Sequence, residues 1–162
     1  DHKSEHLMKV ELIDESMTNK LGKALAKSCP EAPFFATLRG DLGVGKSHLV
    51  RAFLKKLGVT DAIPSPTYTL CETYIINRKL IISHMDLYRL QDPEELEFLG
   101  FRDMLDRQGV LIEWPERAAS FLPFSDLDLH LIWNGERRIC VLAAKSEKGE
   151  RWLSNLEVIN AA

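Results

Sequence analysis

The segment from Gly40 to Ser47 constrains the fold of this chain most strongly, because it matches the pattern G-x-x-x-x-G-K-[ST]. A short apolar run, Phe34 to Leu38, precedes it, and a segment with helical spacing of apolar residues, Ser47 to Leu57, follows it. A glycine-rich turn between a buried strand and a helix directs successive backbone N–H groups at one point near the positive end of the helix. The pattern therefore predicts a loop that binds the phosphates of a nucleoside triphosphate.

Individual residues of this loop have predicted roles. Lys46 would place its ammonium group on the β and γ phosphates, and Ser47 would offer its hydroxyl to Mg²⁺. The predicted nucleotide-binding residues of the segment are Gly40, Asp41, Leu42, Gly43, Val44, Gly45, Lys46, Ser47 and His48. Two alternatives stay open: the glycine-rich turn fits the pattern by chance, or His48 is only a solvated side chain.

Two carboxylates follow apolar runs that read as buried strands. Leu80 to Met85 ends in Asp86, and Val110 to Ile112 ends in Glu113. Phosphoryl transfer and hydrolysis use an acid at the carboxyl end of a neighbouring strand to hold magnesium or to orient the attacking water. We therefore predict Asp86, Glu113 and Lys46 as catalytic residues, and Ser47, Glu113 and Asp86 as metal ligands. The alternative is that either acid only caps the turn or helix that follows.

The remaining pattern predicts an α/β fold with a mixed, mainly parallel sheet flanked by helices and a C-terminal β-hairpin. The hairpin has a type I′ turn at Asn134-Gly135. Strands are expected at 10–13, 34–38, 68–76, 79–85 and 110–114, and the two strands of the hairpin at 127–133 and 139–143. Helices are expected at 14–27, 47–57, 93–105, after Pro115 and at 149–159.

Composition narrows the class of protein. The chain has 162 residues, 45% of them hydrophobic and 28% charged, which fits one folded domain over residues 1–162, with 1–7 as a candidate tail. The net charge of −3 disfavours direct binding to nucleic acid.

Cys29, Cys71 and Cys140 are odd in number and widely spaced, which favours a reducing compartment. No apolar run is long enough to span a membrane, and we expect a cytoplasmic protein.

Taken together, several segments resemble the TsaE family, also called YjeE, the P-loop ATPase subunit of bacterial tRNA threonylcarbamoyladenosine synthesis. The segments that carry the resemblance, between Thr18 and Pro115, are Thr18 to Gly22, Gly40 to Ser47, Ser65 to Leu70, His84 to Leu90, Glu94 to Gly100 and Leu111 to Pro115. The resemblance implies Mg²⁺-dependent hydrolysis of ATP that is slow in isolation. It also implies action with the TsaB and TsaD proteins, which would contact the tRNA in place of this chain.

The resemblance also assigns residues. It implies that Thr67 belongs to a switch-like loop that senses the nucleotide, that Asp86 lies near nucleotide and magnesium, and that Glu113 takes the Walker B position with Trp114 beside it. The chain departs from the family's usual Ala at Val44, its Thr at Ser47 and a frequent Thr at His48. Ser47 keeps the hydroxyl, whereas the two methyl groups of Val44 put nucleotide affinity in question.

Other functions remain open at this stage. A small-molecule P-loop kinase would have a second substrate, and a non-enzymatic adaptor would use ATP only to stabilise a binding surface. The guanine-reading pattern N-K-x-D is absent after the loop, which disfavours a GTPase. The adenine pocket could use the segment 16–18 or Arg137 and Arg138 of the C-terminal hairpin, and we include Arg138 among the nucleotide-binding candidates, with a solvated surface arginine as the alternative.

Overall fold

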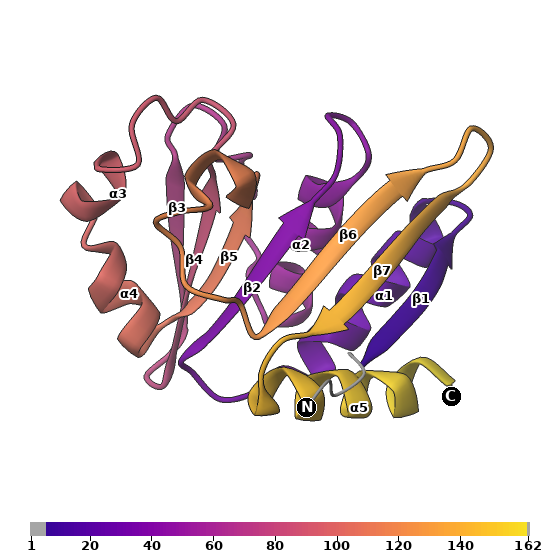
Figure 1. Ribbon diagram of the computed structural model, residues 1–162. Coiled ribbons are helices and arrows are strands. Elements are labelled where there is room, and N and C mark those ends of the chain that lie inside the picture. Colours follow the sequence, from indigo (N-terminus) through magenta and orange to yellow (C-terminus); the bar gives the residue numbers. More distant parts are fainter. Residues whose placement is uncertain (1–5, 162) are drawn as a thin grey trace, which may run out of the picture.

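The computed structural model describes residues 6–161 and contains one seven-stranded sheet with helices on both faces (Figure 1). The strands are β1 (Leu7–Leu12), β2 (Phe34–Arg39), β3 (Cys71–Asn77), β4 (Leu80–Asp86), β5 (Gly109–Glu113), β6 (Leu127–Trp133) and β7 (Arg138–Ala144). The helices are α1 (Glu15–Lys27), α2 (Lys46–Lys56), α3 (Glu95–Phe98), α4 (Phe101–Arg107), α5 (Glu147–Ala161) and the 3₁₀ helix η1 (Pro115–Ala118).

The sheet order is β1-β7-β6-β2-β5-β4-β3. Strand β2 lies in the centre and pairs in parallel with β5 and β6, and β4 pairs in parallel with β5. Only β3 and β7 run against the other five strands, because each forms an antiparallel hairpin with a neighbour. The predicted mixed, mainly parallel sheet with a C-terminal hairpin is therefore confirmed.

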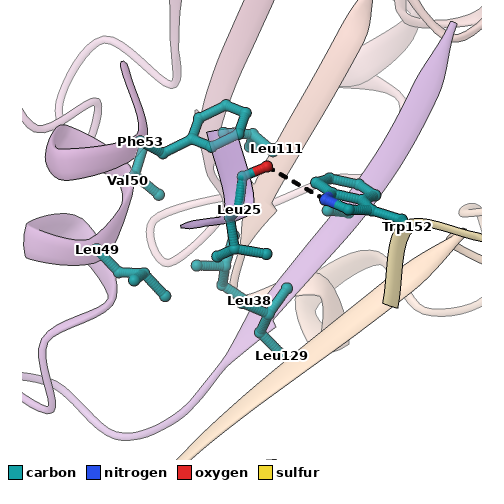
Figure 2. Close-up of a pocket in the computed structure, with 9 residues that line it drawn as sticks. Leu25, Leu38, Leu49, Val50, Phe53, Leu111, Leu129 and Trp152 are labelled. Carbon is teal, nitrogen blue, oxygen red and sulfur yellow. Dashed lines mark hydrogen bonds between the residues drawn. The ribbon is translucent and has the colours of Figure 1, made fainter. Parts of the chain in front are cut away.

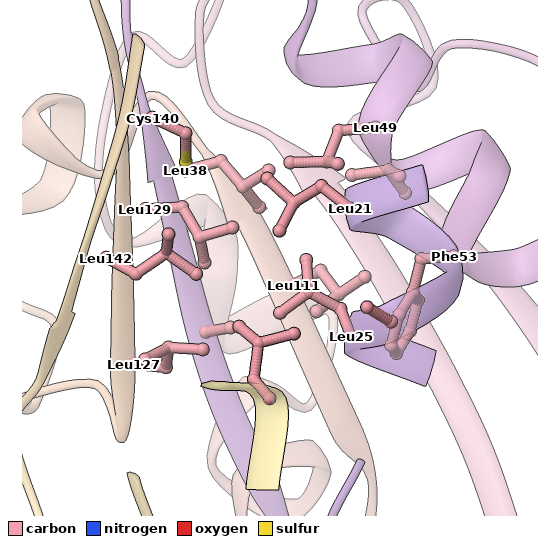
Figure 3. Close-up of a cluster of buried hydrophobic side chains, with 14 of the residues drawn as sticks. Leu21, Leu25, Leu38, Leu49, Phe53, Leu111, Leu127, Leu129, Cys140 and Leu142 are labelled. Atoms are coloured by element: carbon pink, nitrogen blue, oxygen red, sulfur yellow. The ribbon is translucent and has the colours of Figure 1, made fainter. Parts of the chain in front are cut away.

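The two faces of the sheet carry separate hydrophobic cores, because successive strand residues point to opposite sides. On one face, Leu38, Leu111 and Leu129 pack against Leu25 and Phe53 of α1 and α2 (Figure 3). On the other face the core contains residues of α3, α4 and η1 together with alternate strand residues: Phe35, Met85, Leu87, Leu96, Phe101, Val110, Ile112 and Ala118. Strands β2, β4 and β5 are thus covered on both sides, as parallel strands usually are.

A small cavity lies inside the first core (Figure 2). Its volume is about 20 Å³, and its lining side chains are all hydrophobic. The indole N–H of Trp152 donates to the carbonyl oxygen of Leu25 at 3.2 Å, so the polar group beside the cavity is satisfied. Such a space holds at most one water and offers it no free polar partner, so we interpret it as a packing gap.

The structure corrects several boundaries expected from the sequence. The single helix expected over 93–105 is two helices, α3 and α4, because Gly100 between them has a φ of 71°. The strand expected from Tyr68 begins at Cys71, and β5 ends at Glu113 rather than Trp114. Of the candidate tail, residues 1–5 lie outside the described residues, whereas Leu7 already belongs to β1.

The turn of the C-terminal hairpin is shifted by one residue from the expected type I′ turn at Asn134-Gly135. Asn134 N donates to Arg137 O, so the two central residues are Gly135 and Glu136. Only Gly135 of these two has a positive φ, 97°, which fits a type II′ turn.

Two further expectations can be compared with the structure. All three cysteines are free. Burial raises the pKa of the Cys29 thiol to about 12, and burial also raises the pKa of Cys140. Among the helices of residues 6–161, none combines the length and apolar character that a membrane span requires.

Candidate nucleotide-binding site

The glycine-rich loop joins the carboxyl end of β2 to the first turn of α2, at the sheet's edge where β4 and β5 also end (Figure 1). Gly40 and Gly45 have φ values of 148° and 108°, which favour glycine. A side chain at Gly40 would also meet the carbonyl oxygen of Leu131 at 2.6 Å. The loop is therefore held tightly against β6 at its first residue and enters α2 at Gly45.

Val44 does not obstruct this loop. Its side chain is buried among the core residues beneath the loop, and its Cγ1 atom lies 2.8 Å from where a Cβ at Gly40 would be. The two methyl groups therefore pack in the core beneath the loop.

Lys46 is buried beside the acids of the site. Its ammonium group donates to the carbonyl oxygen of Gly40 and lies 3.9 Å from the centre of the Trp114 ring. Burial lowers the pKa of Lys46, while Glu113, Glu116, Asp86 and Asp41 oppose this shift. Burial favours an anionic partner for the ammonium group, so Lys46 at the start of α2 is well placed to bind a phosphate oxygen.

Glu113 is the centre of a buried hydrogen-bond network. The Ser47 hydroxyl lies 3.2 Å from each of its carboxylate oxygens, and His84 Nε2 lies 2.6 Å from Oε2. The side chains of Glu113 and His84 are almost fully buried. The serine of the loop and the acid at the end of β5, 66 residues apart in the sequence, thus meet directly.

Asp86 lies on the neighbouring strand, because it is the parallel register partner of Glu113. Its Oδ2 accepts from the Thr67 hydroxyl at 2.9 Å and its Oδ1 from the backbone N–H of Tyr88 at 3.0 Å. The Ser65 and Thr67 hydroxyls are 2.8 Å apart. The turn at 65–70 is therefore attached to the site through Asp86.

These oxygen donors fit magnesium. Within the described part of the chain, no three His, Cys, Asp or Glu side chains form a group that could hold a metal by themselves. Magnesium is usually held by one or two carboxylates and a hydroxyl, with waters and substrate phosphates completing the coordination. Ser47, Glu113 and Asp86 supply such hard oxygen atoms, so the residues present suit Mg²⁺ bound together with a phosphate.

Backbone strain marks both loops beside the acids. Trp114, directly after Glu113, has a φ of 57°, and Leu70, directly before β3, has a φ of 69°. Residues other than glycine pay roughly 1–3 kcal/mol for such conformations, which concentrate at functional sites. The residue with this strained backbone, Trp114, is also the residue whose ring packs against the Lys46 ammonium group.

The other predicted residues lie around the loop. Asp41, Leu42 and Gly43 are exposed at its tip. His48 Nε2 lies 2.9 Å from Asn19 Oδ1 of α1, so His48 faces the neighbouring helix. Arg138, at the start of β7, donates weakly to Val44 O at 3.4 Å. The structure therefore places Arg138 against the loop, although it is 94 residues away in the sequence.

Sequence reasoning missed two residues of this region. His84 was read as part of a strand, and Trp133 only as the end of another strand. A signal was available for His84, since Ser83 and His84 are consecutive polar residues inside an otherwise apolar run. For Trp133 no local signal exists, because its position beside the loop follows from strand pairing.

A glycine loop of this shape, at the carboxyl edge of such a sheet and leading into a helix, defines the class of a P-loop nucleotide-binding protein. Comparison with known families and structures narrows this class. The family described as "Threonylcarbamoyl adenosine biosynthesis protein TsaE" matches residues 12–139, and the chain belongs to the TsaE family.

Individual relatives agree with this assignment. The tRNA threonylcarbamoyladenosine biosynthesis protein TsaE of Haemophilus influenzae is 40% identical over 136 residues, covering 83% of this chain and 85% of the relative. The protein of the same name from Bacillus subtilis is 39% identical over 94 residues, covering 57% and 58%. The crystal structure of Bacillus subtilis YdiB has the same fold, with a TM-score of 0.78, 22% identity, and coverage of 98% of this chain and 99% of that chain.

Proposed function

We propose that this chain is an Mg²⁺-dependent ATPase, slow in isolation, that serves the formation of threonylcarbamoyladenosine in tRNA. The observation that carries the proposal is the contact between the Ser47 hydroxyl and the Glu113 carboxylate beside the buried amine of Lys46. Membership of the TsaE family supports the tRNA pathway.

Each residue has a role in this proposal. The amides of residues 40–48 and the amine of Lys46 bind the phosphates. Ser47 and Glu113 hold magnesium, directly or through water, and Asp86 supports the metal or the attacking water. Thr67 links the turn at 65–70 to Asp86, and Arg138 contacts the nucleotide from the hairpin. When bound, the ion neutralises charge on the phosphates, so catalysis rests on positioning and electrostatic stabilisation.

Partner proteins are part of the proposal. With a net charge of −3 the chain offers little electrostatic attraction to tRNA. We therefore propose that it acts in the cytoplasm with TsaB and TsaD, and that tRNA is contacted through them.

The decisive test of ATP hydrolysis is Lys46→Ala. The variant should lose Mg²⁺-dependent release of phosphate from ATP and bind ATP more weakly, because the buried cation for the phosphates is gone. Lys55→Ala, at the exposed end of the same helix, is the matched control and should match the unmodified protein. Unchanged turnover in Lys46→Ala would contradict the assignment. Transfer of labelled phosphate to an added metabolite would instead indicate a kinase.

A second experiment tests the pathway. The chain is mixed with TsaB and TsaD and examined for co-elution and for ATP-dependent modification of tRNA. We expect both, and we expect Lys46→Ala to abolish the modification. If a hydrolysis-deficient variant that still binds ATP supported repeated rounds of modification, the protein would be a nucleotide-gated adaptor.

A further inference from the structure

Four side chains form a row that begins at the buried amine of Lys46 and ends at the protein surface. The Lys46 ammonium group lies 3.9 Å from the centre of the Trp114 ring. The centres of the Trp114 and Tyr88 rings are 5.0 Å apart, with an angle of 51° between the ring planes. The guanidinium carbon of Arg117 lies 5.4 Å from the centre of the Tyr88 ring. Two aromatic rings therefore connect a buried cation, Lys46, to an exposed one, Arg117.

The pairing of β4 with β5 explains why the two rings meet. Asp86 and Glu113 are register partners at the ends of these strands. Directly beyond them, Leu87 N donates to Glu113 O at 3.0 Å, so the pairing continues past the last residue of β4. Tyr88 is the next residue, and its backbone N–H donates to Asp86 Oδ1 at 3.0 Å. Hydrogen bonds to the two acidic residues therefore fix the backbone that carries the Tyr88 ring.

On the β5 side, the chain turns sharply after Glu113. Trp114 has a φ of 57°, and the 3₁₀ helix η1 begins at the next residue, Pro115. Arg117 N donates to Trp114 O at 3.1 Å, and this turn brings the Arg117 side chain to the Tyr88 ring. A strained backbone conformation persists only where the surrounding structure holds it. The contact with the Tyr88 ring is one interaction that holds Trp114 in place.

The position of the Trp114 ring matters for the amine of Lys46. A long lysine side chain loses much conformational freedom when it is held in one position. Here the ammonium group donates to the carbonyl oxygen of Gly40 and packs against the indole ring. A cation over the face of an indole ring is attracted by the electrons of the ring, and more strongly where water is excluded. The Trp114 ring therefore helps to fix the ammonium group at the start of α2.

Tyr88 affects Lys46 through this ring. Trp114 is only partly buried, so its ring needs a neighbouring side chain to keep it in one position. Aromatic pairs with centres about 4.5–7 Å apart are stabilised beyond the burial of apolar area, and the spacing of 5.0 Å between Tyr88 and Trp114 lies in this range. Loss of the Tyr88 ring would therefore free the Trp114 ring to leave the Lys46 ammonium group.

We propose that Tyr88 is a positioning residue for Lys46, because its ring keeps Trp114 against the ammonium group. This inference rests on the proposed function, since it requires that Lys46 binds the phosphates of ATP. It assigns separate roles to two residues at the end of β4: Asp86 supports the metal or the attacking water, and Tyr88 positions the lysine of the loop.

The experiment measures the affinity for Mg²⁺-ATP by titration calorimetry. In Tyr88→Leu, which keeps an apolar side chain but removes the ring, the affinity should fall by about 2- to 13-fold, the factor that corresponds to the loss of one aromatic pair. Tyr88→Phe keeps the ring and should bind ATP as the unmodified protein does. An equal loss of affinity in both variants would overturn the proposal, because the hydroxyl group rather than the ring would then be responsible.

A double-mutant cycle tests whether Tyr88 acts through Trp114. Trp114→Leu should lower the affinity for Mg²⁺-ATP, because the contact of the indole ring with Lys46 is lost. When Tyr88→Leu is added to Trp114→Leu, the affinity should not fall further. If Tyr88→Leu lowered the affinity by the same factor with and without the Trp114 ring, the two residues would act independently, and the proposal would be wrong.

Phe98→Leu is the matched control. Phe98 is the last residue of α3, its side chain is 90% exposed, and its ring does not belong to the row. Its replacement should leave the affinity for Mg²⁺-ATP unchanged. A loss as large as that of Tyr88→Leu would mean that removal of any aromatic ring in this region disturbs the site, and the specific role of Tyr88 would be refuted.

The remaining outcomes separate this inference from the proposed function. Equal affinity of the unmodified protein and Tyr88→Leu for Mg²⁺-ATP would overturn the positioning role and leave the ATPase proposal intact. If the unmodified protein did not bind Mg²⁺-ATP, the proposed function would fail, and the positioning role with it.

Discussion

The Glu113 carboxylate shows how single residues define this site. A buried carboxylate needs partners, since burial of an unpaired charge is costly. Here the partners are Ser47 and His84, one from the glycine-rich loop and one from β4. The hydrogen bonds that stabilise the buried Glu113 therefore also hold its carboxylate against Ser47.

Replacement of Glu113 should separate hydrolysis from binding. We expect Glu113→Gln to lower ATP turnover by on the order of 100-fold, because the amide lacks the negative charge that we propose holds magnesium. ATP binding should fall much less, since the loop amides and Lys46 remain. Phosphate release and calorimetry measure the two quantities, and equal loss of both would indicate a structural role instead.

His84 should act as a positioning residue for Glu113. Its Nδ1 atom is buried and has no hydrogen-bond partner, so the tautomer with the proton on Nε2, donating to Glu113, avoids a buried unpaired donor. We expect His84→Phe to lower the affinity for Mg²⁺ in the presence of nucleotide by about 10- to 100-fold, because loss of a hydrogen-bond partner of a metal ligand usually has an effect of this size.

The conservative variant is the control for His84. His84→Gln can still donate a hydrogen bond to Glu113, so this variant should keep most of the affinity for Mg²⁺. Titration of Mg²⁺ at fixed nucleotide, followed by calorimetry, measures the effect, and binding of nucleotide without metal should be the same in all three proteins. A similar defect in both variants would show that His84 only fills space.

At the scale of elements, the close packing of α1 against α2 supports the start of α2, and hence the loop. The helices approach closely at Gly22, where an added Cβ would lie 2.6 Å from Ala52 Cβ and 2.9 Å from Leu49 O. Neither atom belongs to a flexible side chain. Gly22 is therefore required by packing, although glycine is a poor helix former.

Gly22→Ala should destabilise the protein despite the gain in helix propensity. The methyl group costs about 1–3 kcal/mol through overpacking, against a gain of up to about 1 kcal/mol from propensity. Urea unfolding followed by circular dichroism measures the change. Adding Ala52→Gly should make room for the methyl group, so the double variant should lose less free energy of unfolding than the two single changes together. If the loss in the double variant equalled the sum of the two single losses, the close contact between Gly22 and Ala52 would be contradicted.

At the scale of the whole molecule, the first and last described elements are connected through His6. Its ring nitrogens contact Glu150 Oε2 at 3.0 Å and Glu157 Oε1, both on α5. Burial lowers the pKa of His6, but the hydrogen bonds with Glu157 and Glu150 outweigh it, so the pKa is raised above its usual 6.5. Protonated His6 therefore stabilises the folded state.

Because the pKa of His6 is raised in the folded state, the stability of the protein should depend on pH. The stabilisation is complete below about pH 6.5, where His6 is protonated in both states, and it is lost as the pH rises through the higher pKa of the folded state. The thermal midpoint of the unmodified protein should exceed that of His6→Ala by up to about 3 °C at pH 5.5. The difference should shrink by pH 8.5. Glu157→Gln should reduce the difference at low pH, and a difference independent of pH would contradict the ion pairs.

The sequence by itself predicts those parts of the structure that are fixed by residues close together along the chain. The loop from Gly40 to Ser47, the strand before it and the helix after it follow from local glycine conformations and apolar periodicity, and both carboxylates were found because each ends a buried strand. The break of the helix at Gly100 was missed, since a helical pattern of apolar residues continues across a glycine.

Only the tertiary structure decided which distant groups meet. Parallel pairing of β4, β5 and β2 places Asp86 beside Glu113 and Glu113 beside Ser47, and β6 extends beyond its pairing with β2 to Trp133. Such contacts depend on strand order and register. Register is set by burial of whole faces of the sheet, which no short segment of the sequence contains.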